Sequence, residues 1–72
     1  MSKDSALINL FLSSRDLITR VVSRIVPPKE IEDIVQETYV RICQIDKAEH
    51  IQSPRSFMLK TAKNLAFDYL KS

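Results

Sequence analysis

The sequence contains no glycine. Tight hairpin turns and the loops that cradle phosphate groups usually need a residue that tolerates positive φ, and glycine meets that need most easily. Neither a Walker-type loop nor a dinucleotide-binding fingerprint can be written without glycine. The absence therefore argues against the common nucleotide-binding folds and favours a chain made of helices.

Cysteine is nearly absent as well, since Cys43 is the only one in the sequence. A single cysteine allows no disulfide within the chain and no cysteine-based zinc cluster. His50 has no second ligand at a useful spacing, so we expect neither a metal site nor a cofactor. We predict that Cys43 is a small residue in or near the core.

Long apolar runs are also missing. No stretch approaches the roughly 20 apolar residues that span a bilayer, and the start Met1-Ser2-Lys3-Asp4 does not lead into a signal peptide. We therefore predict a cytoplasmic protein without membrane insertion. No serine, histidine and acid arrangement and no carboxylate pair in an apolar setting stands out, so we expect no catalysis.

What the sequence does contain is typical of one small soluble domain. It has 72 residues, of which 44% are hydrophobic and 28% are charged, so a packed core is expected. Its charges are unevenly distributed. Residues 1–28 carry four basic and two acidic side chains, residues 29–49 carry three and six, and residues 50–72 carry four and one. An acidic segment between basic ones suggests two different partners.

Apolar residues at spacings of three and four predict three main helices in a compact all-α bundle. The first segment, from Asp4 to Ile25, is one long helix or two short ones, because Ser13-Ser14 could mark a break. Asp4 is a plausible N-cap for it. Pro27-Pro28 ends this segment and starts the next helix near Pro28.

The second helix has two different faces. Its core stripe is predicted to consist of Ile31, Ile34, Val35, Thr38 and Ile42. Its polar stripe, a candidate interface, consists of Glu30, Asp33, Glu37, Arg41 and Gln44. Periodicity then fades between Gln44 and Gln52, which predicts a connecting loop.

The third helix is predicted to run from about Pro54 to Leu70, with Ser53 as its N-cap. The side expected to face the core consists of Met58, Leu59, Ala62, Leu65, Ala66, Tyr69 and Leu70. The opposite side combines cations, an amide and an aromatic ring, at Lys60, Lys63, Asn64, Phe67 and Lys71. A surface of this kind favours nucleic acid as a partner.

Two contiguous runs resemble a known family. The run from Glu32 to Ile42 reads EDIVQETYVRI, and it is similar to region 2.2 of bacterial sigma factors of the extracytoplasmic-function group. In that family this helix binds the clamp helices of the largest subunit of RNA polymerase. The resemblance implies that four residues point toward the polymerase core: Asp33, Gln36, Glu37 and Arg41.

The second run, from Pro54 to Leu70, reads PRSFMLKTAKNLAFDYL and resembles regions 2.3 and 2.4 of the same family. There, this helix and the preceding loop contact the non-template strand of the minus-ten promoter element and help to hold it open. Expected phosphate contacts are Arg55, Lys60, Lys63 and Lys71. Asn64 either reads a base edge or braces a neighbouring helix. Phe57 and Phe67 are expected in the core rather than as stacking platforms.

By the same resemblance, the loop from Gln44 to Ser53 captures a base flipped out of the strand, with Lys47, His50 and Gln52 as its polar candidates. The family also implies an anti-sigma protein as a partner. It normally carries a second helical domain, region 4, which this sequence lacks, so we expect an excised domain of a longer protein. Two alternatives stay open: a helix-turn-helix DNA-binding domain, and a helical protein-interaction bundle without DNA contact.

Overall fold

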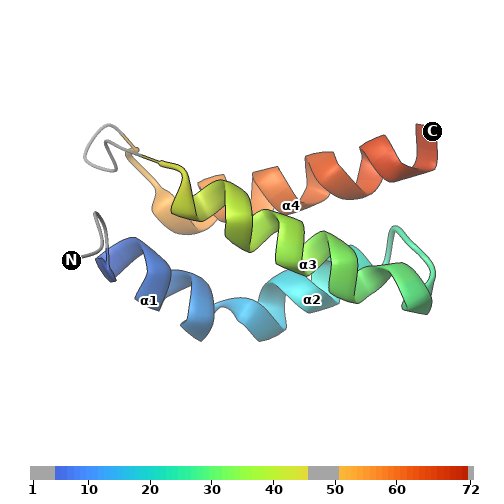
Figure 1. Cartoon of the computed structure of the whole chain (residues 1–72), viewed down its shortest axis with the longest axis horizontal. Helices are drawn as coiled ribbons and strands as arrows, with labels where there is room; N and C mark the ends of the chain where they lie inside the picture. The colour runs from blue at the N-terminus through green and yellow to red at the C-terminus, as the bar shows by residue number, and fades with distance from the viewer. Residues whose placement is uncertain (1–4, 46–50, 72) are drawn as a thin grey trace.

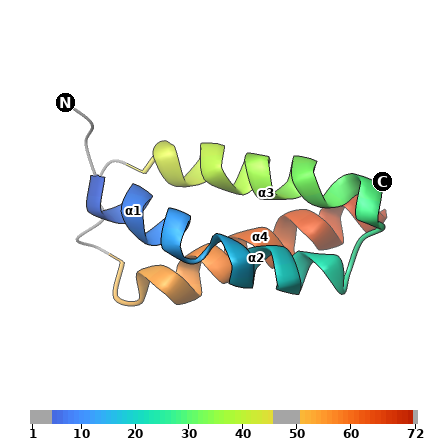
Figure 2. The ribbon, with the colours of Figure 1, turned by 90° about the horizontal axis from the view of Figure 1, so that it is seen from below.

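The computed structural model describes residues 5–45 and 51–71. Within these ranges the chain forms four helices: α1 (Ser5–Ser13), α2 (Arg15–Ser23), α3 (Pro28–Cys43) and α4 (Pro54–Lys71). α1 and α2 follow one another along one side of the bundle, α3 runs back antiparallel to them, and α4 runs in the direction of α2 (Figures 1 and 2). The first predicted segment is thus two short helices, and the all-helical prediction is confirmed for the described residues.

The break between α1 and α2 lies at Ser14, one of the two serines expected to cause it. Its backbone adopts φ −101° and ψ 4°, which is outside the helical region. The Ser14 N–H still donates to the carbonyls of Leu10 and Phe11, both at 3.0 Å, and its own carbonyl accepts from Ile18 at 2.9 Å. The Ser14 N–H and carbonyl therefore both keep backbone partners at the bend. Ser14, however, is only 4% exposed, and its hydroxyl has no hydrogen-bond partner among the described residues.

Replacing Ser14 by alanine is expected to raise the free energy of unfolding by about 1 kcal/mol, because a buried unpaired hydroxyl costs about 1–3 kcal/mol. Urea unfolding followed by circular dichroism measures this change. Ser13→Ala is the matched control, since the exposed Ser13 hydroxyl already donates to the Leu10 carbonyl at 3.0 Å. A Ser14→Ala chain that unfolds at lower urea than the wild type contradicts the prediction.

Proline starts both long helices, as the sequence predicted. α3 begins at Pro28, with Pro27 extended before it at φ −63° and ψ 155°. α4 begins at Pro54, and the Ser53 carbonyl accepts the Phe57 N–H at 2.9 Å. A proline in the first turn loses nothing, because its missing N–H would have no partner inside the helix. The expected cap at Asp4 and much of the expected loop lie outside the described residues.

All four helices contribute to one core. The described hydrophobic residues buried in it are Leu7, Phe11, Ile18, Val22, Val26, Ile34, Val35, Ile42, Met58, Ala62 and Ala66. Thr38 is buried among them and donates its hydroxyl to the Ile34 carbonyl at 2.8 Å, so its burial leaves no unpaired donor. The predicted core stripe of α3 is confirmed, with Ile31 half-buried at its edge. α4 packs against each of the other helices.

Five side chains expected in or near the core are exposed instead. Cys43 lies one residue beyond Ile42, which turns it about 100° away from the buried side of α3. Tyr69 and Leu70 are 36% and 55% exposed in the last turn of α4, beyond the last buried alanine of that helix. Phe67 is 49% exposed on the outer side of α4. The fifth, Phe57, is 38% exposed in the first turn, where the core covers it incompletely.

No helix in the part of the chain described here is both long and apolar enough to cross a membrane.

Candidate nucleic-acid and protein interfaces

The outer side of α4 carries the side chains that the sequence singled out for nucleic acid. Lys60, Lys63, Asn64, Phe67 and Lys71 are all exposed, and we call these five residues the α4 surface. A hollow of about 450 Å³ runs along it, lined by Ser56, Leu59, Lys60, Lys63, Asn64 and Phe67. Its lining is partly apolar, through Leu59 and Phe67, and partly polar, through two lysines, an amide and a hydroxyl. The face expected to point outward is therefore confirmed as exposed.

The charges of the α4 surface are available to a partner. Lys60, Lys63 and Lys71 make no ion pair with any residue in the described ranges. An ammonium group without a carboxylate neighbour can neutralise a phosphate without first breaking a pair. The exposed ring of Phe67 can stack on an unpaired base, which is worth about 1–3 kcal/mol per base. The arrangement suits a single nucleic-acid strand.

Not every predicted DNA contact lies on the α4 surface. Arg55 is exposed in the first turn of α4, but it points about 140° away from Lys60 around the helix axis. The structure thus brings together Lys60, Lys63, Asn64 and Lys71, and leaves Arg55 at one end. The candidates Lys47 and His50 lie outside the described residues.

On α3, the residues expected to bind protein are also exposed. Asp33, Gln36, Glu37 and Arg41 lie on its outer side, and we call these four residues the α3 surface. The Arg41 Nε donates to the Glu37 Oε2 at 3.3 Å, a pair of one helical turn that contributes about 0.2–0.5 kcal/mol. Asp33 has no ion-pair partner in the described part of the chain. The α3 surface therefore keeps a net negative charge.

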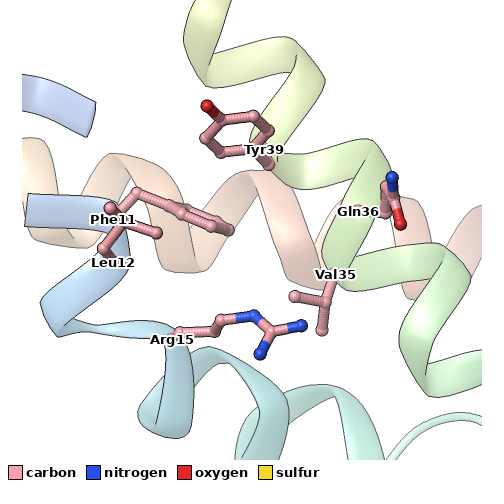
Figure 3. Close-up of a pocket in the computed structure, with 6 residues that line it drawn as sticks. All are labelled: Phe11, Leu12, Arg15, Val35, Gln36 and Tyr39. Carbon is pink, nitrogen blue, oxygen red and sulfur yellow. The ribbon is translucent and has the colours of Figure 1, made fainter. Parts of the chain in front are cut away.

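A second hollow, of about 240 Å³, lies beside the α3 surface, between the α1–α2 break and the middle of α3. Figure 3 shows Phe11, Leu12 and Arg15 facing α3 across it, with Gln36 at one edge. The rings of Phe11 and Tyr39 pack with their centroids 5.2 Å apart at an angle of 52°. Leu12 is 56% exposed at the rim.

Charge also surrounds this hollow. The Arg15 guanidinium pairs with the Glu32 carboxylate at 3.3 Å, which joins the start of α2 to α3. The pKa of the Tyr39 phenol is raised, first by its hydrogen bond to Cys43, then by the Cys43 charge and by desolvation. Sequence reasoning missed Leu12, Arg15 and Tyr39 as lining residues. The one available signal was that Leu12 and Tyr39 are apolar residues that stand outside the predicted core stripes.

In the described ranges, no group of three or more histidine, cysteine, aspartate or glutamate side chains is placed to hold a metal ion.

Comparison with known families identifies the family of the chain. The family model for sigma-70 region 2 matches residues 10–72, which includes the end of α1 and all of α2, α3 and α4. The chain belongs to the sigma-70 region 2 family. Searches of curated proteins and of solved structures each find no match.

As a sigma-70 region 2 domain, the chain is part of a transcription initiation factor and not of a catalytic family. Domains of this family bind RNA polymerase and promoter DNA, so two surfaces of opposite charge are expected on it. The four helices described above are consistent with the region 2 fold. Membership in the extracytoplasmic-function group stays a prediction, based on the two sequence runs.

Proposed function

We propose that this sigma-70 region 2 domain binds the clamp helices of the polymerase core through the α3 surface and the minus-ten promoter element through the α4 surface. It acts in the cytoplasm as part of a factor of the extracytoplasmic-function group, to which an anti-sigma protein binds. Its contribution is binding free energy: it holds the non-template strand open while the polymerase does the chemistry.

The observation that carries this proposal is the composition of the α4 surface. Lysines that pair with no residue of the described ranges stand beside an exposed ring and an amide on a single helix, along a hollow of about 450 Å³. Lysines supply phosphate contacts, Phe67 supplies a face for stacking, and Asn64 carries both a donor and an acceptor for a base edge. In a closed duplex the faces of the bases are covered by their neighbours, and they become available to Phe67 only when the duplex opens. These contacts therefore favour the open strand over the duplex.

The charge of the α3 surface supports a different partner for α3. Asp33 and Glu37 would repel phosphates, which argues against α3 as a recognition helix in the major groove. This weakens the helix-turn-helix alternative, even though only residues 24–27 separate α2 from α3. Exposed carboxylates suit a basic protein surface instead, and they would orient its approach.

The test is fluorescence anisotropy with a labelled single-stranded minus-ten oligonucleotide at two salt concentrations. Replacing both Lys60 and Lys63 by glutamate is expected to weaken binding at least roughly 20-fold near 0.1 M salt, because each lost phosphate contact removes about 0.7 from the salt slope. The control Arg15→Glu/Lys29→Glu changes the charge equally on exposed residues of α2 and α3.

The two variants distinguish the proposal from its alternatives. If the Lys60→Glu/Lys63→Glu chain binds the strand like the wild type, the α4 surface is not the binding site. If the wild-type chain binds polymerase core but not the strand, the chain is a protein-interaction bundle. If both variants lose affinity equally, the strand responds to total charge and the α4 surface has no special role. Circular dichroism of each variant verifies that the helices are intact.

A further inference from the structure

α2 carries two arginines, Arg15 and Arg20, and Arg24 follows directly as its C-cap. The structure gives these three arginines different surroundings. Arg15 pairs with Glu32 of α3 at 3.3 Å, so the side of α2 that bears Arg15 faces α3. Arg20 and Arg24 are exposed and make no ion pair with any described residue. Neither the α3 surface nor the α4 surface includes them. Their charges therefore remain unused by the function proposed above.

Helix geometry places these two arginines away from α3. At 100° per residue, Arg20 lies about 140° and Arg24 about 180° around α2 from Arg15. Between Arg24 and the buried Ile18 come Leu17 and Val21, which are half-buried although they face away from α3. α2 packs against α4 as well as α3, so α4 covers this side. Arg24 thus lies at the edge where α2 meets α4.

The same geometry identifies the matching edge of α4. α2 and α4 run in one direction and α3 runs in the other (Figure 2). We call a rotation around a helix forward when it has the sense in which the residue number increases. A forward rotation of about 60° around α2 leads from the buried Ile18 to Arg15, on the side that faces α3. In a bundle of three right-handed helices with these directions, the same forward rotation around α4 leads from its core to α2. On α4 it leads from Ala62 past the half-buried Leu59 to Lys63.

Lys63 and Arg24 therefore lie on facing edges of two neighbouring parallel helices. Cations continue outward from both edges, to Lys60 on α4 and to Arg20 on α2. Packed helices stand about 8–10 Å apart, so these positive charges form a broad surface rather than a single line. A single strand can follow one line of cations. A duplex presents two phosphate backbones across grooves about 6 and 12 Å wide, which suits a broad surface.

We propose that Arg20 and Arg24 extend the α4 surface onto α2 and bind backbone phosphates of duplex DNA adjoining the opened minus-ten strand. This inference rests on the proposed function, because it assumes that α4 holds the open strand. The duplex is a second DNA element, which Arg20 and Arg24 bind through its backbone and without regard to its sequence.

The test compares two labelled DNAs, the single-stranded minus-ten oligonucleotide and a fork in which the same strand leaves a duplex arm. The full chain is used, with Arg20→Gln/Arg24→Gln as the variant. Its affinity for the fork is expected to fall at least roughly tenfold near 0.1 M salt, and its salt slope by about 2, since each duplex phosphate contact contributes about 0.9. Its affinity for the single strand should stay within about twofold of the wild type.

Arg15→Gln/Lys29→Gln is the matched control, since it removes two positive charges from exposed positions away from the α2–α4 edge. If both variants lose affinity for the fork equally, or if neither loses affinity, the inference is overturned and the proposed function stays intact. If the wild-type chain does not bind the single strand but Arg20→Gln/Arg24→Gln weakens its binding to the fork, the proposed function fails, while duplex binding by α2 stands. Circular dichroism verifies folding of both variants.

Discussion

Alanine in place of Met58 is expected to destabilise the chain by about 2–5 kcal/mol, because truncating a buried side chain removes its contacts and leaves a cavity. Met58 is 0% exposed and lies on α4, the helix that packs against all three others. A chain of 72 residues has little stability in reserve, since small domains bury a modest share of their surface. Much of the variant should therefore be unfolded near room temperature.

Urea or thermal unfolding followed by circular dichroism measures the effect. Leu70→Ala is the control on the same helix, because Leu70 is 55% exposed and its truncation should change stability by less than about 0.5 kcal/mol. Equal unfolding midpoints for the two variants would show that α4 is not packed as described. Addition of the minus-ten strand should partly restore helix content in Met58→Ala, because a ligand that binds only the folded state stabilises it.

The second large effect is expected for polymerase binding. Replacing both Asp33 and Glu37 by lysine should weaken binding of the chain to polymerase core roughly 100-fold, or about 3 kcal/mol, because like charges would then meet across the interface. Both side chains are exposed, so the fold should tolerate the change. Loss of the Glu37–Arg41 pair, at 3.3 Å, accounts for only about 0.2–0.5 kcal/mol of stability.

Asp16→Lys/Asp68→Lys is the matched control, since it reverses two exposed carboxylates on α2 and α4. Association with core polymerase can be followed by anisotropy of a labelled chain, and binding of the minus-ten strand should be retained by Asp33→Lys/Glu37→Lys. If Asp33→Lys/Glu37→Lys binds polymerase core as tightly as the control Asp16→Lys/Asp68→Lys does, the α3 surface is not the docking site. The resemblance to region 2.2 would then describe the fold alone.

Much of the fold follows from local features of the sequence. Prolines mark the starts of α3 and α4 because they cannot continue a preceding helix and lose nothing in a first turn. The three-and-four spacing identifies Ile34, Val35 and Ile42 as core residues because residues at that spacing share one side of a helix. The outward position of Lys60 and Lys63 follows in the same way. Each of these features depends on one helix at a time.

What the sequence could not predict depends on how helices meet. Whether Tyr69 is covered depends on how far the neighbouring helices extend beside the last turn of α4. The hollow beside the α3 surface needs Phe11 and Tyr39 to come together from positions far apart in the chain. Likewise, one must know the order of the three helices around the core to see that Arg15 lies beside α3 and Arg24 beside α4. Periodicity within a single helix carries none of this information.

The direct packing of α3 against α4 also determines how the two surfaces move. Ile42 on α3 is 2% exposed, and Ala62 and Ala66 on α4 are 0% exposed, so the two helices share one close-packed interior. Such interiors are nearly incompressible. If polymerase binds the α3 surface as proposed, it thereby also fixes the position and orientation of the lysines on α4. The register of the opened strand relative to the enzyme is then set by the rigidity of this core.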